Sequence, residues 1–281
     1  MIPLQKFHSY GNDFLIIESH HLTEHEYESF SKTICTPHFG VGADGCVILE
    51  KRSRREIRIR IFNQDGSEAG MSGNGVRCAV AYAQRNGLVE SDEISVLTIS
   101  GQKSNKVLEV HPPVWTYISS LGVPSFEPED IPIRLSEGHR SGHQYELTVA
   151  QRPMMVTPLS VGNPQCVVFV KSFPELSEFQ LLGEALERHS FFPERTNVSF
   201  LKVMGSNEIE IRIWERGVGP THSSGTGSSG AGVAAILLDK VSSPVQVSTE
   251  TGTQTVEWGI SEQVKLTGEA RFVAEIGFHW G

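Results

Sequence analysis

The sequence predicts an α/β protein made of two similar domains, and three observations support this prediction. One Gly-rich stretch, Ser72-Gly73-Asn74-Gly75, returns about 150 residues later as Ser224-Gly225-Thr226-Gly227, a spacing far beyond the period of a solenoid repeat. A Gly-Asn pair precedes each copy, at Gly11-Asn12 and at Gly162-Asn163. Strand-like and helix-like patterns alternate along both halves. The repeat therefore predicts two equivalent helix N-termini that are available to one ligand.

The strand predictions depend on short apolar runs and on alternation between apolar and charged residues. Ile57–Phe62 and Ile209–Trp214 alternate strictly, as expected for a half-exposed sheet. Phe14–Ile17 and Cys46–Leu49 are continuous apolar runs of strand length. A last strand is expected at Phe272–Phe278, and the pattern leaves open which domain it joins.

Four segments have the pattern of helices, and two of them start directly after the Gly-rich stretches. Prolines at Pro112-Pro113 and between residues 124 and 132 mark the region between the halves, so we place the domain boundary near Gly122. The expected helices are Thr23–Thr33, Gly75–Asn86, Pro174–His189 and Gly227–Leu238.

The composition is that of a globular protein with an acidic balance. The 281 residues are 38% hydrophobic and 20% charged, which suits two domains or one large one with sizeable cores. The formal net charge of −9 argues against nucleic acid or an anionic membrane as the main partner. The N-terminus lacks the apolar stretch of a signal peptide, and the longest apolar run, Val233–Leu238, is too short to span a bilayer.

The cysteines and histidines predict no disulfide framework and no metal site. Each cysteine stands singly, without a C-x-x-C motif, so we expect reduced structural thiols in a cytoplasmic protein. The histidines lack the spacing of metal ligands. The cysteines are Cys35, Cys46, Cys78 and Cys166.

The segment from Asn63 to Gly75 follows a predicted strand and precedes a predicted helix. Free backbone N–H groups and the positive end of the helix dipole make such a place an anion site, and glycine lets a ligand approach the backbone closely. An ordinary strand–turn–helix connection with an Asn-Gly turn would look the same. Its repetition at Ser224 favours a functional interpretation.

The second copy adds a charged pair, Glu215-Arg216, at the end of a strand. Arginine can bind a carboxylate through two parallel hydrogen bonds, and glutamate can accept from an ammonium group, so the pair suits an amino acid. A surface ion pair is the simpler alternative. Gly225–Gly230 also matches G-x-G-x-x-G by letter, but a loop from Glu215 to Ser224 separates it from the strand, unlike a dinucleotide-binding motif. P-loop and G-x-S-x-G patterns do not occur around either serine.

These motifs together resemble the diaminopimelate epimerase family in order and over essentially the whole chain. The matching segments are Gly11–Phe14, Gly40–Gly45, Asn63–Glu68, Gly73–Gly75 with Arg77-Cys78, Gly162–Pro164, Pro193–Val198, Glu215–Gly217 and Gly225–Gly227.

The resemblance implies two pseudo-symmetric domains, each a curved, mostly antiparallel sheet wrapped around a central helix whose N-terminus points at a cleft. It assigns residues 1–121 with the last strand, 270–281, to the first domain, and 122–269 to the second. It also implies cofactor-independent interconversion of LL- and meso-diaminopimelate, a step toward lysine and peptidoglycan. The partner is then this small molecule, and a homodimer is a possible assembly.

The resemblance also assigns the site residues. In the family, two cysteines at the helix starts exchange the substrate α-proton from opposite faces, because a thiol at a helix N-terminus can ionise near neutral pH. Here Ser72 and Ser224 occupy these catalytic positions, although a serine hydroxyl is a weak base unless another base activates it. The substrate-binding residues implied are Asn12, Asn63, Gly73, Asn74, Asn163, Asn197, Glu215, Arg216, Gly225 and Thr226.

Three explanations of the serines stay open. The chain is an epimerase variant that uses serine poorly or with help, an engineered double substitution, or a paralogue. The paralogue would be another amino-acid isomerase or dehydratase, or a non-catalytic binder of a diamino diacid. Gly45 is a further departure, and those at Pro220, Ser229 and Gly230 are not explained by engineering of two positions.

Overall fold

The structure is a computed structural model that describes residues 1–280, and the chain in it divides into two compact units. Unit 1 contains Met1–Ser119 and the segment from Thr267 onward, and unit 2 is Ser120–Leu266. Gly281, the last residue of the expected first domain, lies outside the described residues. Both units mix strands with a few helices, which confirms the predicted α/β class.

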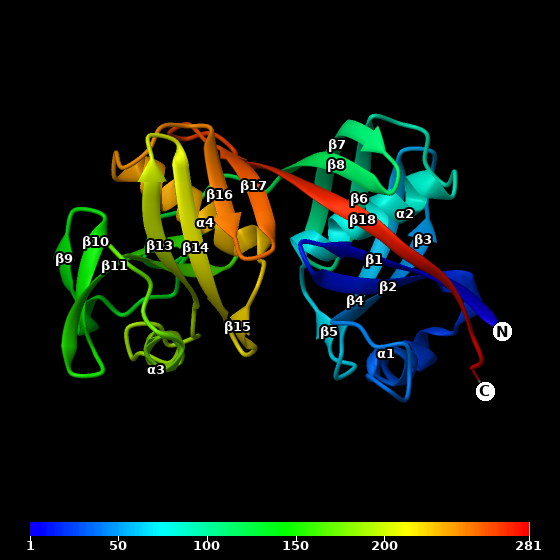
Figure 1. The fold of residues 1–281 in the computed structure, drawn as a ribbon, viewed down its shortest axis with the longest axis horizontal. Helices are drawn as coiled ribbons and strands as arrows, with labels where there is room; N and C mark the ends of the chain where they lie inside the picture. Colours follow the sequence, from blue (N-terminus) through cyan, green and yellow to red (C-terminus); the bar gives the residue numbers. More distant parts are fainter. Residues whose placement is uncertain (281) are drawn as a thin grey trace. The chain divides into compact units, whose positions relative to one another are not determined.

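Unit 1 contains the N-terminal elements and most of the last strand, which are labelled in Figure 1. Its elements are β1 (Ile2–Ser9), β2 (Asn12–Glu18), the 3₁₀ helices η1 (Ser19–His21) and η2 (Glu24–Glu26), α1 (Tyr27–Cys35), β3 (Gly45–Lys51), β4 (Glu56–Asn63), β5 (Glu68–Ala69), α2 (Gly73–Arg85), β6 (Glu93–Thr98), β7 (Gly101–His111), β8 (Val114–Ser120) and β18 (Lys265–Phe278).

Eight strands of unit 1 pair in a closed series. β1 and β2 are antiparallel, β2 and β3 parallel, β3 and β4 antiparallel, and β4 and β6 parallel. β6, β7 and β8 continue as antiparallel neighbours, and β18 pairs with both β8 and β1. Closure leaves these strands without a long free edge, which would otherwise invite pairing with another chain.

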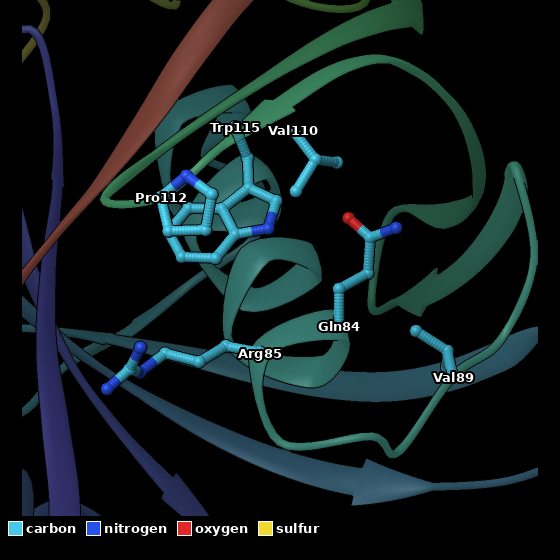
Figure 2. A pocket seen from close by; sticks show the side chains of 6 residues that line it. All are labelled: Gln84, Arg85, Val89, Val110, Pro112 and Trp115. Atoms are coloured by element: carbon cyan, nitrogen blue, oxygen red, sulfur yellow. The ribbon is translucent and has the colours of Figure 1, made fainter.

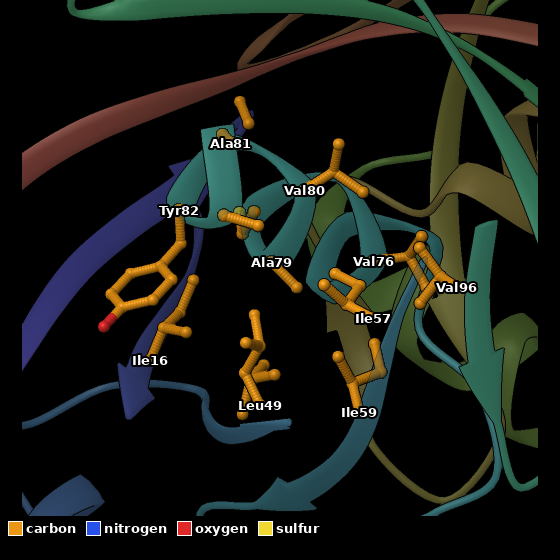
Figure 3. Packing of buried hydrophobic residues seen from close by; sticks show 14 of the residues in the cluster. Ile16, Leu49, Ile57, Ile59, Val76, Ala79, Val80, Ala81, Tyr82 and Val96 are labelled. Carbon is orange, nitrogen blue, oxygen red and sulfur yellow. The ribbon is translucent and has the colours of Figure 1, made fainter. Parts of the chain in front are cut away.

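The core of unit 1 is formed by α2 and the strands around it. Val76, Ala79 and Val80 of α2 are buried in one cluster with apolar residues of β1, β2, β3, β4, β6 and β8. Figure 3 shows Ala79 of α2 directed toward Leu49, and Val76 beside Ile57 and Val96. α2 carries apolar residues on nearly every face, as expected for a helix that is buried rather than laid on a surface.

Unit 2 contains the other elements. They are η3 (Leu135–Glu137), β9 (His139–Ser141), β10 (Gln144–Val149), β11 (Arg152–Ser160), β12 (Pro164–Phe169), α3 (Leu176–Glu187), β13 (Asn197–Gly205), β14 (Glu208–Glu215), β15 (Gly219–Thr221), α4 (Gly225–Leu237), β16 (Val245–Thr249) and β17 (Gly252–Glu257).

The strand pairings of unit 2 follow the same order as those of unit 1. β11 and β12 are antiparallel, β12 and β13 parallel, β13 and β14 antiparallel, and β14 and β16 parallel, before β17 adds antiparallel to β16. α2 and α4 occupy the same place in the two series. α2 follows β4 and the short β5, and α4 follows β14 and the short β15. β4 and β14 are the two strands that the alternation of apolar and charged residues predicted.

Several predicted boundaries differ from the observed ones. α2 and α4 begin two residues earlier than expected, at Gly73 and Gly225, because the preceding serines cap them. The helix expected at Thr23–Thr33 is split into η2 and α1. The last strand is much longer than expected and begins at Lys265. The placement of Pro112-Pro113 between the halves was wrong, because these prolines form the turn between β7 and β8 within unit 1.

The cysteines agree with the sequence prediction, since all four are unpaired and buried. Within residues 1–280, none of the helices has both the length and the apolar character that crossing a membrane requires.

Candidate active site

Ser72 is the N-cap of α2. Its backbone is extended, with φ −141° and ψ 116°, and its side-chain oxygen accepts a hydrogen bond from the Gly75 N–H at 3.1 Å. Its carbonyl accepts the first helical hydrogen bond, from the Val76 N–H at 2.9 Å. This is the geometry that N-cap serines adopt, and it explains why a Gly-rich segment starts a helix here.

Ser224 caps α4 with nearly the same geometry. Its φ is −143° and its ψ 125°, and its side-chain oxygen accepts from the Gly227 N–H at 3.2 Å. In both helices, the two backbone N–H groups that precede the N–H bonded to the capping serine have no partner within the helix. These N–H groups belong to Gly73 and Asn74 in unit 1, and to Gly225 and Thr226 in unit 2. Each unit therefore carries one helix start suited to an anion.

The Gly-Asn pairs lie beside these helix starts. Gly11 has φ 86° and Gly162 has φ 93°, a left-handed conformation in the tight turns before β2 and β12. The turns carry Asn12 and Asn163 to the first residues of the helices. Asn74 donates its side-chain N–H to Asn12 Oδ1 at 3.1 Å, and Asn163 donates to Thr226 Oγ1 at 3.4 Å.

Asn12 is held on its other side by a carboxylate. Its Nδ2 donates to Asp44 Oδ2 at 2.8 Å, and the same oxygen accepts from the Asp13 N–H at 3.1 Å. Asp13 in turn accepts from the Asp44 N–H and forms an ion pair with Lys6 at 2.6 Å. This closed set of contacts fixes the Asn12 amide relative to α2.

Asn163 is held in unit 2 by a buried glutamine. Gln165 donates from Nε2 to Asn163 Oδ1 at 2.8 Å. Thr226, which accepts from Asn163, also lies 3.4 Å from the Ser224 hydroxyl. A hydrogen-bonded series thus joins Gln165 on β12 to the cap of α4.

Asn197 and Arg216, two further candidate binding residues of unit 2, contact each other. Asn197, which is buried, donates to the Pro164 carbonyl at 2.9 Å and accepts from the backbone N–H of Arg216 at 3.0 Å. The exposed Arg216 guanidinium donates to the Glu194 carbonyl at 3.1 Å and has further N–H groups to offer to a carboxylate. Glu215 is half-buried at the end of β14, opposite Gly219.

Asn63 is hydrogen-bonded within its own turn. It ends β4, is exposed, and donates from Nδ2 to Ser67 Oγ at 3.0 Å. Its backbone pairs with Gly45 of β3, so it lies on the same strand end as the loop that leads to Ser72.

The titratable groups near the serines supply neither helix start with a thiolate. Burial raises the pKa of the Cys78 and Cys46 thiols to about 12 and also raises the pKa of Cys35 and Cys166. His222, close in sequence to Ser224, is exposed and contacts Glu250 at 3.0 Å. Among the hydrogen bonds described within each unit, those of Ser72 and Ser224 involve only backbone N–H groups and Thr226.

Sequence reasoning missed the residues that hold the asparagines. Gln165 received no role, and Asp44 and Arg77 entered only as parts of matching motifs. A signal for Gln165 existed in Gly230, because a Cβ added at Gly230 would lie 2.9 Å from the Gln165 side chain. Gln165 of β12 packs against α4 at Gly230, where the helix has no side chain. This contact can be recognised only once the positions of β12 and α4 are known.

Two surface hollows of unit 1 lie away from these residues. The hollow in Figure 2 has a volume of ≈ 350 Å³ and surrounds the last turn of α2, at the opposite end from Ser72. A second hollow, of ≈ 690 Å³, lies along β1 and β18. The first is lined by Gln84, Arg85, Val89, Val110, Pro112 and Trp115.

The structure is similar to several solved structures of low sequence identity. A probable proline racemase from Agrobacterium radiobacter has a TM-score of 0.69 at 14% identity, and covers 100% of this chain and 94% of its own. A hydroxyproline epimerase from Agrobacterium vitis has a TM-score of 0.66 at 16% identity, with 98% and 90% covered. These similarities support the fold.

The sequence comparisons identify the family. The family model described as "Diaminopimelate epimerase" matches residues 5–125 and 157–273. A diaminopimelate epimerase from Pelotomaculum thermopropionicum is 36% identical over 270 residues, with 95% of each chain covered. One from Desulforudis audaxviator is 37% identical over 254 residues, with 90% of each covered. By sequence and by the placement of its motifs, the chain belongs to the diaminopimelate epimerase family.

Proposed function

We propose that this protein is an amino-acid epimerase that interconverts LL- and meso-diaminopimelate without a cofactor, for lysine and peptidoglycan precursor synthesis. The observation that carries the proposal is the repeated helix start: Ser72 and Ser224 cap α2 and α4 with the same backbone geometry, each beside a fixed asparagine. The curated relatives named above support the choice of substrate.

The proposed reaction removes the α-proton of one amino-acid end and returns a proton to the opposite face. The negative charge that develops at the α-carbon spreads into the adjacent carboxylate. Helix-start N–H groups, those of Gly73 and Asn74 in unit 1 or those of Gly225 and Thr226 in unit 2, would donate to this carboxylate and stabilise the transition state. In this proposal the positions of Ser72 and Ser224 carry the two proton-transfer groups.

The other candidate residues would bind the distant end of the substrate. The Arg216 guanidinium is the group suited to the distal carboxylate, because it can form two parallel hydrogen bonds with it. Asn63, Asn163 and Asn197 offer amide donors and acceptors, and Glu215 can accept from an ammonium group. These assignments rely on the family resemblance together with the local contacts of each residue.

We also propose the finer architecture that the family implies. Residues 1–121 with 270–281, and residues 122–269, form two pseudo-symmetric domains, each with a curved and mostly antiparallel sheet around a central helix. The matching order of pairings in the two units supports this. The unpaired cysteines favour a reducing compartment, and we place the protein in the cytoplasm.

The measurement that tests the function is exchange of the substrate α-proton in D₂O with LL-diaminopimelate. Four proteins are compared: the chain as it stands, Ser72→Cys, Ser224→Cys and the double variant. We expect slow exchange in the first and a rise of several powers of ten in the double variant, since each general acid or base contributes about 10²–10⁴-fold. Each single variant should stay slow in epimerisation, because both a donor and an acceptor are needed.

Two outcomes would change the proposal. If the unmodified chain matches the double variant, the serines are competent and the thiol argument is wrong. If the double variant binds diaminopimelate without exchange, the protein is a binder or a paralogue. Calorimetry with diaminopimelate and with NAD tests the dinucleotide alternative. That alternative requires that the protein binds NAD and does not bind diaminopimelate.

A further inference from the structure

Arg77 is the largest fully buried side chain of the protein and has an unsatisfied N–H donor. It lies on the second turn of α2 and is 0% exposed. Its Nη1 has no hydrogen-bond partner. A guanidinium stays protonated in proteins, so this is a positive charge inside unit 1. Charged groups are almost never fully buried without a partner, which makes this arginine unusual.

The partners that Arg77 does have are neutral. Its Nη2 donates to Asn74 Oδ1 at 2.5 Å, and its Nε and Nη2 donate to the Ser9 hydroxyl at 3.3 and 3.2 Å. No ion pair described within unit 1 includes Arg77. Burial lowers the pKa of Arg77, and the phenol of Tyr10 and the thiol of Cys78 are the nearby groups that oppose this. The charge is therefore not cancelled by a carboxylate bonded to it.

The free N–H of Arg77 lies next to the first residue of α2. A Cβ built on Gly73 would be 3.9 Å from Arg77 Nη1, so the unpartnered nitrogen is adjacent to the helix start. The other side of the guanidinium holds Asn74, which donates to Asn12. Asn74 thus takes its orientation from Arg77, and through Asn74 the contact reaches Asn12, which Asp44 also holds.

The equivalent position of unit 2 carries no charge. Counting from the capping serines, Arg77 of α2 corresponds to Ser229 of α4, which is also 0% exposed. The two helix starts share their cap geometry and differ in the group buried beneath them. A buried cation near an anion site raises the affinity for negative charge much more than an exposed one, because little water screens it.

We infer that Arg77 is a positioning residue that places a buried positive charge under the start of α2 and orients Asn74, which donates to Asn12, so that the helix start of unit 1 binds a carboxylate more strongly than the helix start of unit 2 does. This inference deepens the proposed function and rests on it for the identity of the carboxylate. The asymmetry itself is a property of the two helix starts and can be measured without substrate.

A single thiol at each helix start reports the local potential. Ser72→Cys and Ser224→Cys are prepared separately, each with Arg77 and with Arg77→Gln or Arg77→Lys, and the thiolate is titrated by its ultraviolet absorbance. The native thiols are buried and do not interfere near neutral pH. We expect Arg77→Gln to raise the pKa of the thiol at position 72 by roughly one unit or more, the effect of losing a nearby opposite charge. Arg77→Lys, which keeps the charge, should raise it less.

The thiol at position 224 is the matched comparison, and its pKa should change less than that of the thiol at position 72 in all three backgrounds. If the thiol of Ser72→Cys has the same pKa with Arg77 and with Arg77→Gln, the inference is overturned. If Arg77→Gln does not fold, Ser72→Cys and Ser224→Cys with Arg77 unchanged still test the inference. A pKa of the thiol at position 72 equal to or above that of the thiol at position 224 contradicts the asymmetry. Asp44, which holds Asn12, and Asp13, which pairs with Lys6, are unchanged throughout.

Substrate binding separates this inference from the proposed function. Calorimetry with LL-diaminopimelate should show at least tenfold weaker binding for Arg77→Gln and unchanged binding for Ser229→Ala, the equivalent buried position. If the parent protein does not bind diaminopimelate while the thiol at 72 responds to Arg77, the function is wrong and the asymmetry stands. If the parent binds and neither binding nor the thiol pKa changes with Arg77, only the inference fails.

Discussion

Ser72 accepts a hydrogen bond from the Gly75 N–H at 3.1 Å, across the first turn of α2. The same relationship joins Ser224 to Gly227 at 3.2 Å. Serine is among the best N-cap residues, whereas a thiol is a weak hydrogen-bond acceptor. The two positions to which the proposed function assigns proton transfer therefore hold residues that stabilise the helices. Under the proposed function, helix stability and proton transfer make different demands on the side chains at positions 72 and 224.

Removing either cap should lower the free energy of unfolding. Ser72→Ala and Ser224→Ala are each expected to cost about 1 kcal/mol, the usual value for an N-cap, and Ser→Cys nearly as much. Ser72→Asp keeps an acceptor oxygen at the cap and should cost less than Ser72→Ala. Urea unfolding followed by circular dichroism measures these differences.

An exposed serine outside the caps provides the control for this series. Ser206→Ala lies in the turn between β13 and β14 and should change stability by less than about 0.5 kcal/mol. Equal stabilities of Ser72→Ala, Ser72→Asp and the parent would show that the cap contributes nothing, and that the serine was retained for another reason.

Arg216→Lys should weaken diaminopimelate binding while the protein keeps its fold. The backbone N–H of Arg216 is held by Asn197 in either variant, so the change isolates the guanidinium. Loss of the planar fork is expected to cost roughly 1.5–3 kcal/mol, the range for a hydrogen bond to a charged group. Calorimetry measures the affinity. Arg152→Lys, at an exposed arginine that pairs with Glu178, is the matched control, and an equal loss there would deny Arg216 a specific role.

Gly230→Ala should disturb the side chain that holds Asn163. The added Cβ would lie 2.9 Å from Gln165 Cγ and 3.2 Å from its Cβ, closer than packed atoms allow. Gln165 must move, and its hydrogen bond to Asn163, 2.8 Å long, is then lost. Overpacking of this kind costs typically about 1–3 kcal/mol. Thermal unfolding and diaminopimelate calorimetry should both report the change.

A double-mutant cycle with Gln165→Ala tests the cause. Removal of the glutamine side chain makes room for the new methyl group, so the double variant should be more stable than the sum of the single changes predicts. Additive losses would mean that Gly230 is required for some reason other than contact with Gln165.

The sequence predicted the two helix starts because a repeat can be read without a structure. It placed those starts two residues late, because glycines in the first turn suggest a loop and the capping effect of Ser72 and Ser224 outweighs that preference. The predicted last strand was too short, because Gly268 interrupts the apolar pattern before Phe272.

The burial of Arg77 was beyond sequence reasoning. A charged residue on a helix is ordinarily exposed, and only the closed series of strands around α2 places this one in the interior. The partners of Asn12 and Asn163 likewise come from strands or loops that are distant or unremarkable in sequence, as with Asp44 and Gln165. The asparagines themselves could be named from the motif, but the contacts that orient them could not.

The native cysteines should be unreactive in the folded protein. Burial raises the pKa of Cys46 and Cys78 to about 12, and raises the pKa of Cys35 and Cys166 as well, so hardly any thiolate exists at pH 8. A thiol-specific colorimetric reagent should therefore detect almost no thiol within minutes in the native chain and all four after denaturation. Ser72→Cys should add one rapidly reacting thiol, because position 72 is half-buried at a helix N-terminus. A fast thiol in the unmodified native protein would identify a cysteine that can ionise, and the proton-transfer role proposed for the helix starts would then have to be tested against that cysteine.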